Sequence, residues 1–268
     1  MTAYFITGAG TGLARAMSLA LVGKSAHVIA CDLNEKGLAE TAAMAKGAKG
    51  RLIEHAIDVS DDAQCVAAVA RAEKEFGRLD VLVNCAGLGP VYMRHNFVAD
   101  PLRFWDADKT RWWRMFEVNV RGPFQLARAA APGMIARKWG RIVNITTSLG
   151  TIQRGGNTPY GPSKGAIEAM TIAWAKELKG TGVTMNSLIP GGVTNTAFVP
   201  DAYRAQAKSM LEPDVMKTPI VWIMSDLSAD ITGARFVAKE WDAKLPMNEA
   251  AKKSIEAPVY LKPAQERG

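Results

Sequence analysis

The chain has 268 residues, of which 48% are hydrophobic and 22% charged. This balance is typical of a globular protein with a substantial core, and it excludes disorder as the main state. Lys and Arg number 33 against 26 Asp and Glu, which leaves a net charge of +7. No run of roughly five or six basic residues occurs, so the charge does not by itself indicate a nucleic-acid partner.

The counts of metal-binding and apolar residues exclude further classes. Three cysteines (Cys31, Cys65 and Cys85) form no CxxC pair, and there are only three histidines, which argues against a disulfide framework and against a bound metal. No apolar stretch approaches the roughly 18 residues that span a bilayer, and the first residues do not resemble a signal peptide. We expect a soluble, cytoplasmic protein with no membrane partner.

Short apolar runs alternate with helical patterns along the chain. Strands are predicted near residues 3–7, 26–31, 51–57, 80–84, 141–146, 183–189 and 234–238, and helices over 12–23, 35–46, 61–76, 106–138 and 160–179. Strands separated by helices need crossover connections, so the sheet should be parallel and covered on both faces. No linker or repeat divides the chain. We predict one α/β domain, residues 1–268, with a doubly wound, seven-stranded parallel sheet of Rossmann type.

A glycine-rich motif follows the first predicted strand and opens the first helix: Thr7-Gly8-Ala9-Gly10-Thr11-Gly12-Leu13-Ala14. Glycines at such a turn let the backbone approach a pyrophosphate, which then lies at the positive end of the helix. The G-x-G-x-x-G fingerprint is not matched, because Leu13 occupies its last place; G-x-x-x-G-x-G fits better, with Ala14 in place of the last glycine. The alternative is a plain glycine-rich turn.

Polar residues end the next three predicted strands. Asp32 lies 24 positions after Gly8, where an acidic side chain can bind the ribose hydroxyls of a dinucleotide and repel a 2′-phosphate; it could instead cap the following helix. Asp58-Val59 and Asn84-Cys85-Ala86-Gly87 follow the third and fourth strands. The carboxyl ends of parallel strands are where an open α/β sheet binds its ligand.

A second motif, Tyr160-Gly161-Pro162-Ser163-Lys164, begins the last long predicted helix. Residues four apart share a helix face, and a nearby ammonium favours tyrosinate, which lowers the pKa of the phenol. Such a tyrosine can exchange a proton with a hydroxyl or carbonyl oxygen. A surface Tyr/Lys pair with no such role is the alternative.

Taken in order, these motifs resemble the short-chain dehydrogenase/reductase family over nearly the whole chain. The pieces are TGAGTGLA at 7–14, Asp32, Asp58-Val59, NCAG at 84–87, Asn119 in FEVNV, GRIVNITTS at 140–148, YGPSK at 160–164 and PGGV at 190–193. The resemblance implies reversible oxidation of a secondary alcohol with a nicotinamide cofactor. It implies a catalytic set of Asn119, Thr147, Tyr160 and Lys164, with Tyr160 as general acid/base, Lys164 also holding the nicotinamide ribose, and Asn119 interrupting its helix to support a proton relay through water. The implied cofactor-binding residues are Gly8, Thr11, Gly12, Leu13, Asp32, Asp58, Val59, Asn84, Ala86, Gly87, Tyr160, Lys164, Pro190, Val193 and Thr196.

Two positions depart from the family pattern. Ala14 replaces the last loop glycine, a small change that should still permit cofactor binding. The family's catalytic serine lies 13 residues before the tyrosine, where this chain has Thr147, and Ser148 is adjacent. Threonine keeps a hydroxyl, so the role survives chemically. The spacing selects Thr147, with Ser148 as the alternative.

From Asp32 we expect NAD as the cofactor, with NADP less favoured. The partners expected are a small alcohol or ketone and further copies of the chain, in a dimer or tetramer, with no nucleic acid. Segments near 88–105 and 194–228 fit the strand–helix alternation poorly and are expected to form substrate loops, closing over a partly apolar pocket that accepts a cyclic or moderately bulky substrate. A non-catalytic regulator that senses the dinucleotide is the alternative function. A nucleic-acid-binding protein is a second alternative, suggested by the basic residues between Arg103 and Arg141.

Overall fold

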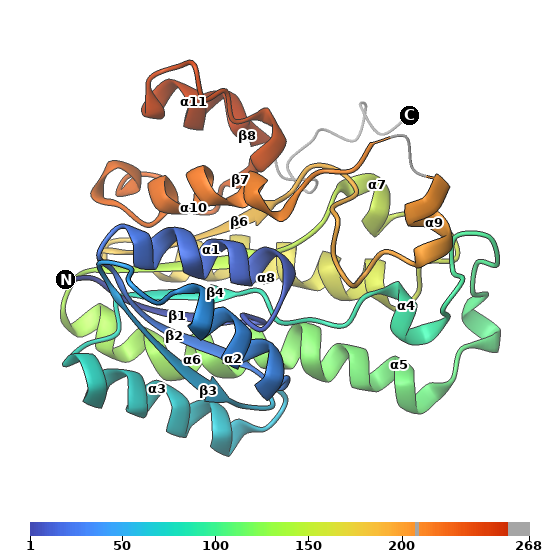
Figure 1. Ribbon diagram of the computed structural model, residues 1–268, viewed down its shortest axis with the longest axis horizontal. Helices are drawn as coiled ribbons and strands as arrows, with labels where there is room; N and C mark the ends of the chain where they lie inside the picture. The colour runs from blue at the N-terminus through green and yellow to red at the C-terminus, as the bar shows by residue number, and fades with distance from the viewer. Residues whose placement is uncertain (207–208, 257–268) are drawn as a thin grey trace.

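The computed structural model of the chain describes residues 1–206 and 209–256. Within those ranges one sheet runs through the molecule, in the order β3-β2-β1-β4-β5-β6-β7-β8 (Figure 1). The strands are β1 (Ala3–Thr7), β2 (His27–Asp32), β3 (Arg51–Ala56), β4 (Val81–Asn84), β5 (Gly140–Ile145), β6 (Val183–Ile189), β7 (Arg235–Val237) and β8 (Ile255–Glu256). The chain is therefore a single α/β Rossmann-like unit, as predicted.

The strand count differs from the prediction by one. Strands β1 to β7 pair in parallel, and β8 adds an antiparallel edge, with Ile255 opposite Phe236. Two residues are too short a run to show the alternation of apolar and polar side chains that marks a strand in sequence.

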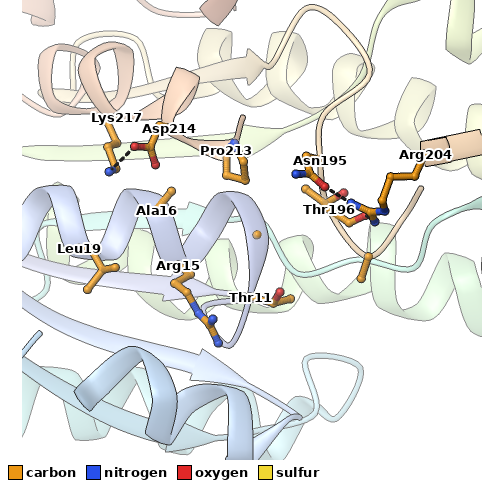
Figure 2. A pocket seen from close by; sticks show the side chains of 12 residues that line it. Thr11, Arg15, Ala16, Leu19, Asn195, Thr196, Arg204, Pro213, Asp214 and Lys217 are labelled. Atoms are coloured by element: carbon orange, nitrogen blue, oxygen red, sulfur yellow. Dashed lines mark hydrogen bonds and ion pairs between the residues drawn. The ribbon is translucent and has the colours of Figure 1, made fainter. Parts of the chain in front are cut away.

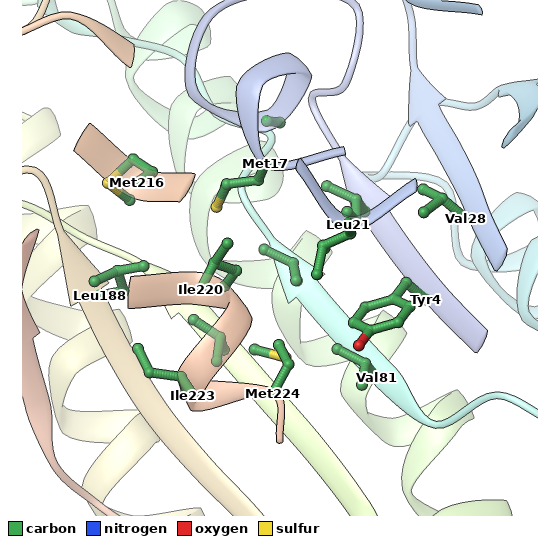
Figure 3. Packing of buried hydrophobic residues seen from close by; sticks show 14 of the residues in the cluster. Tyr4, Met17, Leu21, Val28, Val81, Leu188, Met216, Ile220, Ile223 and Met224 are labelled. Atoms are coloured by element: carbon green, nitrogen blue, oxygen red, sulfur yellow. The ribbon is translucent and has the colours of Figure 1, made fainter. Parts of the chain in front are cut away.

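The helices flank the sheet on both faces. They are α1 (Gly12–Gly23), α2 (Glu35–Met44), α3 (Asp62–Phe76), α4 (Pro90–Met93), α5 (Lys109–Phe116), α6 (Gly122–Ala136), α7 (Leu149–Ile152), α8 (Tyr160–Glu177), α9 (Asp201–Gln206), α10 (Lys217–Ile223) and α11 (Met247–Ser254). Side chains of α1, α2, α10 and α11 join one apolar cluster with the sheet, and those of α3, α6 and α8 join a second. Figure 3 shows the first cluster, where Met17 and Leu21 of α1 lie with Ile220 and Ile223 of α10.

The helix predicted over 106–138 is three segments. Helix α5 ends at Phe116, a π-helical turn (η2, Glu117–Arg121) follows, and α6 begins at Gly122. Asn119 lies in the widened turn and is buried. Apolar periodicity continues through such a turn almost unchanged, so the sequence pattern reads as one helix.

The basic residues between Arg103 and Arg141 are dispersed over the fold. Arg114 forms an ion pair with Asp58, Arg128 with Asp62, and Arg141 is only 2% exposed. Arg111 lies over the ring of Tyr92. Arg114 and Arg141 are therefore engaged within the fold, whereas Arg103 and Arg121 are exposed.

The strand order places a crevice at the middle of the sheet. The chain progresses from β1 through β2 to β3 on one side, and from β4 to β8 on the other. The crossover connections that leave β1 and β4 therefore run in opposite directions, and a crevice opens between them at the carboxyl ends of the strands.

Candidate active site

A cavity of about 710 Å³ occupies this crevice. Its wall runs from the ends of β2 and β3, across the loops after β1 and β4, to the segments after β5 and β6. Of the predicted site residues, it includes Gly8, Thr11, Gly12, Leu13, Asp32, Asp58, Val59, Ala86, Gly87, Thr147, Tyr160, Lys164, Pro190, Val193 and Thr196. The topology thus brings residues that lie far apart in the sequence together in one elongated cavity.

The glycine-rich loop lines the middle of the cavity. Gly8 and Gly12 have φ of +76° and +54°, which favour glycine. A Cβ on Gly8 would lie 3.0 Å from the Cα of Ala86, so the loops after β1 and β4 touch. Thr7 fixes this contact by accepting hydrogen bonds from the backbone N–H groups of Cys85 and Ala86, each at 3.0 Å. The loop leads directly into α1, whose N-terminal N–H groups can bind an anion.

Asp32 closes one end of the cavity. Its carboxylate accepts hydrogen bonds from the backbone N–H of Gly10 at 2.8 Å and of Asn34 at 2.9 Å. The cap of α2 is Asn34, which accepts from the N–H of Gly37, so the reading of Asp32 as the helix cap was wrong.

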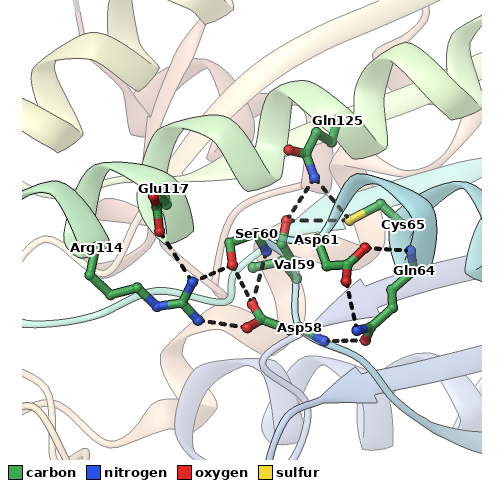
Figure 4. A network of polar contacts seen from close by, with 9 residues as sticks. All are labelled: Asp58, Val59, Ser60, Asp61, Gln64, Cys65, Arg114, Glu117 and Gln125. Atoms are coloured by element: carbon green, nitrogen blue, oxygen red, sulfur yellow. Dashed lines mark hydrogen bonds and ion pairs between the residues drawn. The ribbon is translucent and has the colours of Figure 1, made fainter.

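Asp58 lies at the same end in a network of polar side chains (Figure 4). One carboxylate oxygen accepts from the backbone N–H and the hydroxyl of Ser60, and the other pairs with Arg114 at 2.6 Å. Partial burial acts to raise the pKa of Asp58, but the bonds from Ser60 and Arg114 outweigh it and hold the pKa below its usual range. Asp58 is therefore a charged side chain whose main partner is supplied by α5.

Asn119 lies behind the cavity wall. Its amide accepts from the N–H of Leu88 at 2.7 Å and donates to the carbonyl oxygen of Leu88 and to the hydroxyl of Ser163, both at 3.0 Å. A Cβ on Gly87 would lie 3.1 Å from its Oδ1. The π-helical turn therefore lets one side chain join the loop after β4 to α8.

Tyr160 and Lys164 begin α8 and are both buried. The ammonium of Lys164 donates to the carbonyl oxygen of Ile145 at 2.9 Å and lies 6.0 Å from the centroid of the Tyr160 ring. Burial raises the pKa of Tyr160 to about 12, and a side-chain hydrogen bond with Thr147 acts in the opposite direction. Burial lowers the pKa of Lys164 to about 8, against the influence of Cys85 and Glu168. The phenol is thus kept protonated by the desolvation of its charged form, and the lowered pKa expected from the neighbouring lysine is not found in the chain alone.

Thr147 and Ser148 lie in different surroundings. Thr147 lines the cavity beside Tyr160, and its hydroxyl acts to lower the pKa of that phenol. Ser148 caps α7, where its hydroxyl accepts from the N–H of Thr151 and lies 2.8 Å from the Thr151 hydroxyl. Both residues follow β5, which ends at Ile145, so the alternation of side chains along a strand does not separate them. The helix cap separates them instead.

Replacement of Thr147 by Val should therefore lower kcat by on the order of a hundredfold, because the variant keeps the shape and loses the hydroxyl donor. Thr147→Ser should stay active. Ser148→Ala should leave kcat within a few-fold of wild type, at a cost of about 1 kcal/mol in the free energy of unfolding from the lost cap. Steady-state kinetics and urea unfolding check both variants. Normal turnover in Thr147→Val together with collapse in Ser148→Ala would assign the hydroxyl to Ser148.

A buried ion pair supports the backbone of Thr147. Arg235 of β7 and Glu168 of α8 are 1% and 2% exposed and lie 3.0 Å apart. Arg235 also donates to the carbonyl oxygen of Thr147 at 2.5 Å and pairs with Glu256 of β8. Glu168 accepts from the hydroxyls of Thr146 and Ser187. Sequence reasoning missed this network, because its members are far apart in the chain and match no motif.

Aromatic side chains from two segments enclose the end of the cavity near Tyr160. Tyr92, Phe97 and Phe198 line it, and the ring of Phe198 lies edge-on to Tyr160 at 6.4 Å. A Cβ on Gly89 would lie 2.6 Å from Phe198, so the two segments are in contact. In contrast, Phe104 is 72% exposed and lies away from the cavity. The first residues of each of the two predicted substrate segments thus line the cavity.

The remainder of the segment 194–228 does not line this cavity. Residues 207–208 lie outside the described ranges, and Ile220, Trp222 and Ile223 are buried in the core. A second hollow of about 410 Å³ lies between this part of the chain and α1 (Figure 2). There Lys217 pairs with Asp214, and Arg204 donates to Asn195.

The cavity wall differs from the predicted set of site residues at several positions. The Asn84 side chain does not line it; its amide nitrogen donates to Asn144 at 2.9 Å inside the sheet, and the wall begins at the next residue, Cys85. Thr151, Arg154 and Asn157 do line it, although no motif marks them. In the sequence, only their position between Thr147 and Tyr160 indicated that they could line the site.

Comparison with known proteins agrees with this geometry. The family model described as short chain dehydrogenase matches residues 2–207. The chain belongs to the short-chain dehydrogenase/reductase family. It is accordingly an NAD(P)-dependent oxidoreductase, as the motifs predicted.

Relatives in this family act in different reactions. The chain is 31% identical to the 3-oxoacyl-[acyl-carrier-protein] reductase FabG of Thermotoga maritima, over 85% of this chain and 92% of the reductase. It is 32% identical to 2-(S)-hydroxypropyl-CoM dehydrogenase 3 of Xanthobacter autotrophicus, over 86% and 92% of the two chains. The crystal structure of an NAD⁺-bound xylitol dehydrogenase has a TM-score of 0.77 and 22% identity, over 87% of this chain and 96% of that one, and shows the shared fold.

Two features are absent from the described residues. No group of three or more His, Cys, Asp or Glu side chains among them could hold a metal ion. None of the helices within the same ranges is both long and apolar enough to cross a membrane.

Proposed function

We propose that this chain is an NAD-dependent dehydrogenase of a secondary alcohol, or reductase of the ketone, with Tyr160 as the general acid/base. The observation that carries the proposal is the cavity itself. One end holds the buried Tyr160 and Lys164 with the hydroxyl of Thr147, and the other holds the carboxylate of Asp32. A phenol, a neighbouring amine and a hydroxyl are the groups needed to hold and protonate a carbonyl oxygen.

The residues between these ends fit a dinucleotide. Gly8, Gly12 and Gly87 line the cavity without side chains, and α1 begins there, at Gly12, so that its N-terminal N–H groups are available to a phosphate. Thr11, Leu13 and Thr196 would hold the phosphates, Asp58 and Val59 would border the adenine, and Ala86, Pro190 and Val193 would border the nicotinamide. When bound, the nicotinamide supplies the hydride acceptor for oxidation and the hydride donor for reduction.

The chain's own side chains would transfer the proton and bind the substrate oxygen. The Thr147 hydroxyl would donate a hydrogen bond to the substrate oxygen, and Tyr160 would pass its proton to that oxygen in reduction or take it back in oxidation. Lys164, held by the carbonyl oxygen of Ile145, would stabilise the tyrosinate that forms. Because the pKa of Tyr160 is raised to about 12, its proton-donating form prevails at neutral pH, and oxidation should speed up as pH rises.

Asp32 should make NAD the preferred cofactor, since a 2′-phosphate would add a negative charge beside a carboxylate, and like charges in contact cost several kcal/mol. Arg15, the nearest basic residue of α1, is not free to compensate: it pairs with Glu40 and donates to Thr41 and to the carbonyl oxygen of Gly37. We expect kcat/KM to favour NAD over NADP by at least about tenfold. Asp32→Ser should remove most of that preference, whereas the exposed control Glu35→Gln should retain it.

The experiment measures reduced nicotinamide formed by the purified chain with each cofactor and a panel of secondary alcohols, sugars and hydroxy acids. Equal or better kcat/KM with NADP in the wild type would contradict the role of Asp32. Absence of turnover on the whole panel, with NAD binding intact by calorimetry, would favour the dinucleotide-sensing regulator.

A further inference from the structure

Among the described residues, five charged side chains line the cavity, and four of them have partners. Asp32 accepts two backbone N–H groups, Asp58 and Arg114 pair with each other, and Lys164 donates to Ile145. The fifth is Arg154. Its guanidinium makes no hydrogen bond or ion pair with any residue of the described ranges 1–206 and 209–256.

The backbone at Arg154 is held at the end of the cavity that holds Tyr160, and its side chain is exposed. It follows α7 and precedes α8, in the segment that joins Thr147 to Tyr160. The turn around it is held by Asn157, which is buried and donates to the carbonyl oxygen of Thr151 at 2.8 Å. The backbone N–H of Asn157 in turn bonds to the carbonyl oxygen of Arg154.

The other side chains at this end are mostly apolar. They include Leu88, Tyr92, Phe97, Phe198 and Val199. A ligand that fills this end removes water from the guanidinium, and that loss is offset only if the ligand supplies oxygens to its N–H groups. The planar guanidinium offers parallel N–H donors that match two oxygens of one anionic group.

We propose that Arg154 binds an anionic group of the substrate, so that the physiological substrate is a secondary alcohol or ketone bearing a carboxylate, phosphate or sulfonate beyond an apolar spacer. The net charge of +7 would also favour the approach of such molecules. This substrate class rests on the proposed dehydrogenase function, and the test separates the two.

The first arm measures binding without turnover. Calorimetry of the full chain with saturating NAD compares cyclohexanecarboxylate with the neutral cyclohexanecarboxamide, and then phenylphosphonate and benzenesulfonate. Arg154→Gln should weaken binding of the preferred anion by about tenfold to a hundredfold, the usual range for a charge-assisted hydrogen bond, and should leave the amide unchanged. Arg154→Lys should be intermediate, because it keeps the charge and loses the parallel donors. Arg51→Gln is the matched control, since Arg51 begins β3 at the opposite edge of the sheet and is exposed.

The second arm measures kcat/KM for 4-hydroxycyclohexanecarboxylate and for its methyl ester. A preference for the acid that Arg154→Gln removes and Arg51→Gln retains supports the proposal. Equal binding of carboxylate and carboxamide by the wild type would overturn it, as would an anion preference that survives in Arg154→Gln. Oxidation of the ester alone would sustain the dehydrogenase function and reject the anion site. Selective anion binding without turnover of either compound would support the site and count against the proposed function.

Discussion

Replacement of Tyr160 by Phe should lower kcat by about a thousandfold, within the range of 10²–10⁴ that positioned general acid–base catalysis contributes. The ring should keep its place, because its edge-on contact with Phe198 and its burial at the start of α8 need no hydroxyl. Only the proton donor, which lies beside the Thr147 hydroxyl, is lost. Stopped assays with high enzyme concentration would measure the residual rate, and calorimetry would show NAD affinity within a few-fold of wild type.

Tyr203→Phe is the matched control for the loss of a phenol. Tyr203 belongs to α9 and does not line the cavity, so its variant should turn over normally. Near-normal kcat in Tyr160→Phe would remove the phenol from the mechanism and leave another group to move the proton. A large rise in the Kd for NAD with unchanged kcat would make Tyr160 a cofactor-binding residue alone.

The same variant separates the dehydrogenase from the dinucleotide-sensing regulator. A regulator that only senses the dinucleotide needs the glycine loop and Asp32, and its response would survive the loss of the Tyr160 hydroxyl. Membership of the short-chain dehydrogenase/reductase family, together with a pocket that brings Thr147, Tyr160 and Lys164 into one wall, favours the enzyme.

The sequence predicted the strands and the glycine loop well because both have local causes. Runs such as Val81–Val83 are buried on both faces of a parallel sheet, and Gly8 and Gly12 adopt positive φ. The π-helical turn at Glu117–Arg121 was not predicted, because its apolar spacing resembles that of an ordinary helix. The resemblance to the family did mark Asn119 as an interruption.

Contacts between segments that are distant in the chain could not be predicted, because local sequence patterns carry no information about them. Ser148 and Thr147 are chemically alike, and only the helix cap at Thr151 shows which hydroxyl is engaged elsewhere. The ion pair between Glu168 and Arg235 joins residues 67 positions apart. Arg154 stands out only by elimination, once the partners of the other charges in the cavity are known.

Replacement of Lys164 by Met should abolish most turnover and at the same time stabilise the fold near neutral pH. Burial lowers the pKa of Lys164 from 10.5 to about 8. A shift of about 2.5 units corresponds to a destabilisation of about 3 kcal/mol when the group is charged. Met fills similar space without charge, but it leaves the carbonyl oxygen of Ile145 without its donor, at a cost of about 1 kcal/mol. The net gain in the free energy of unfolding should be about 2 kcal/mol.

The pH dependence identifies the cause of this gain. Below pH 8 the lysine is protonated in both the folded and the unfolded chain, so the full penalty of burying the ammonium is present. Between pH 8 and pH 10.5 the unfolded chain binds more protons than the folded one, so the stability of the wild type rises with pH and the penalty disappears.

Urea unfolding at pH 7 and pH 10 should therefore show Lys164→Met more stable than wild type at pH 7, with the difference reduced or reversed at pH 10. Lys176→Met, an exposed change in the last turn of the same helix, should show no such dependence. A Lys164→Met variant that is less stable at pH 7, or whose gain is the same at both pH values, would mean that the ammonium is well solvated in the folded chain. A stabilised and inactive variant would instead show that this lysine is kept for the reaction at the expense of the fold.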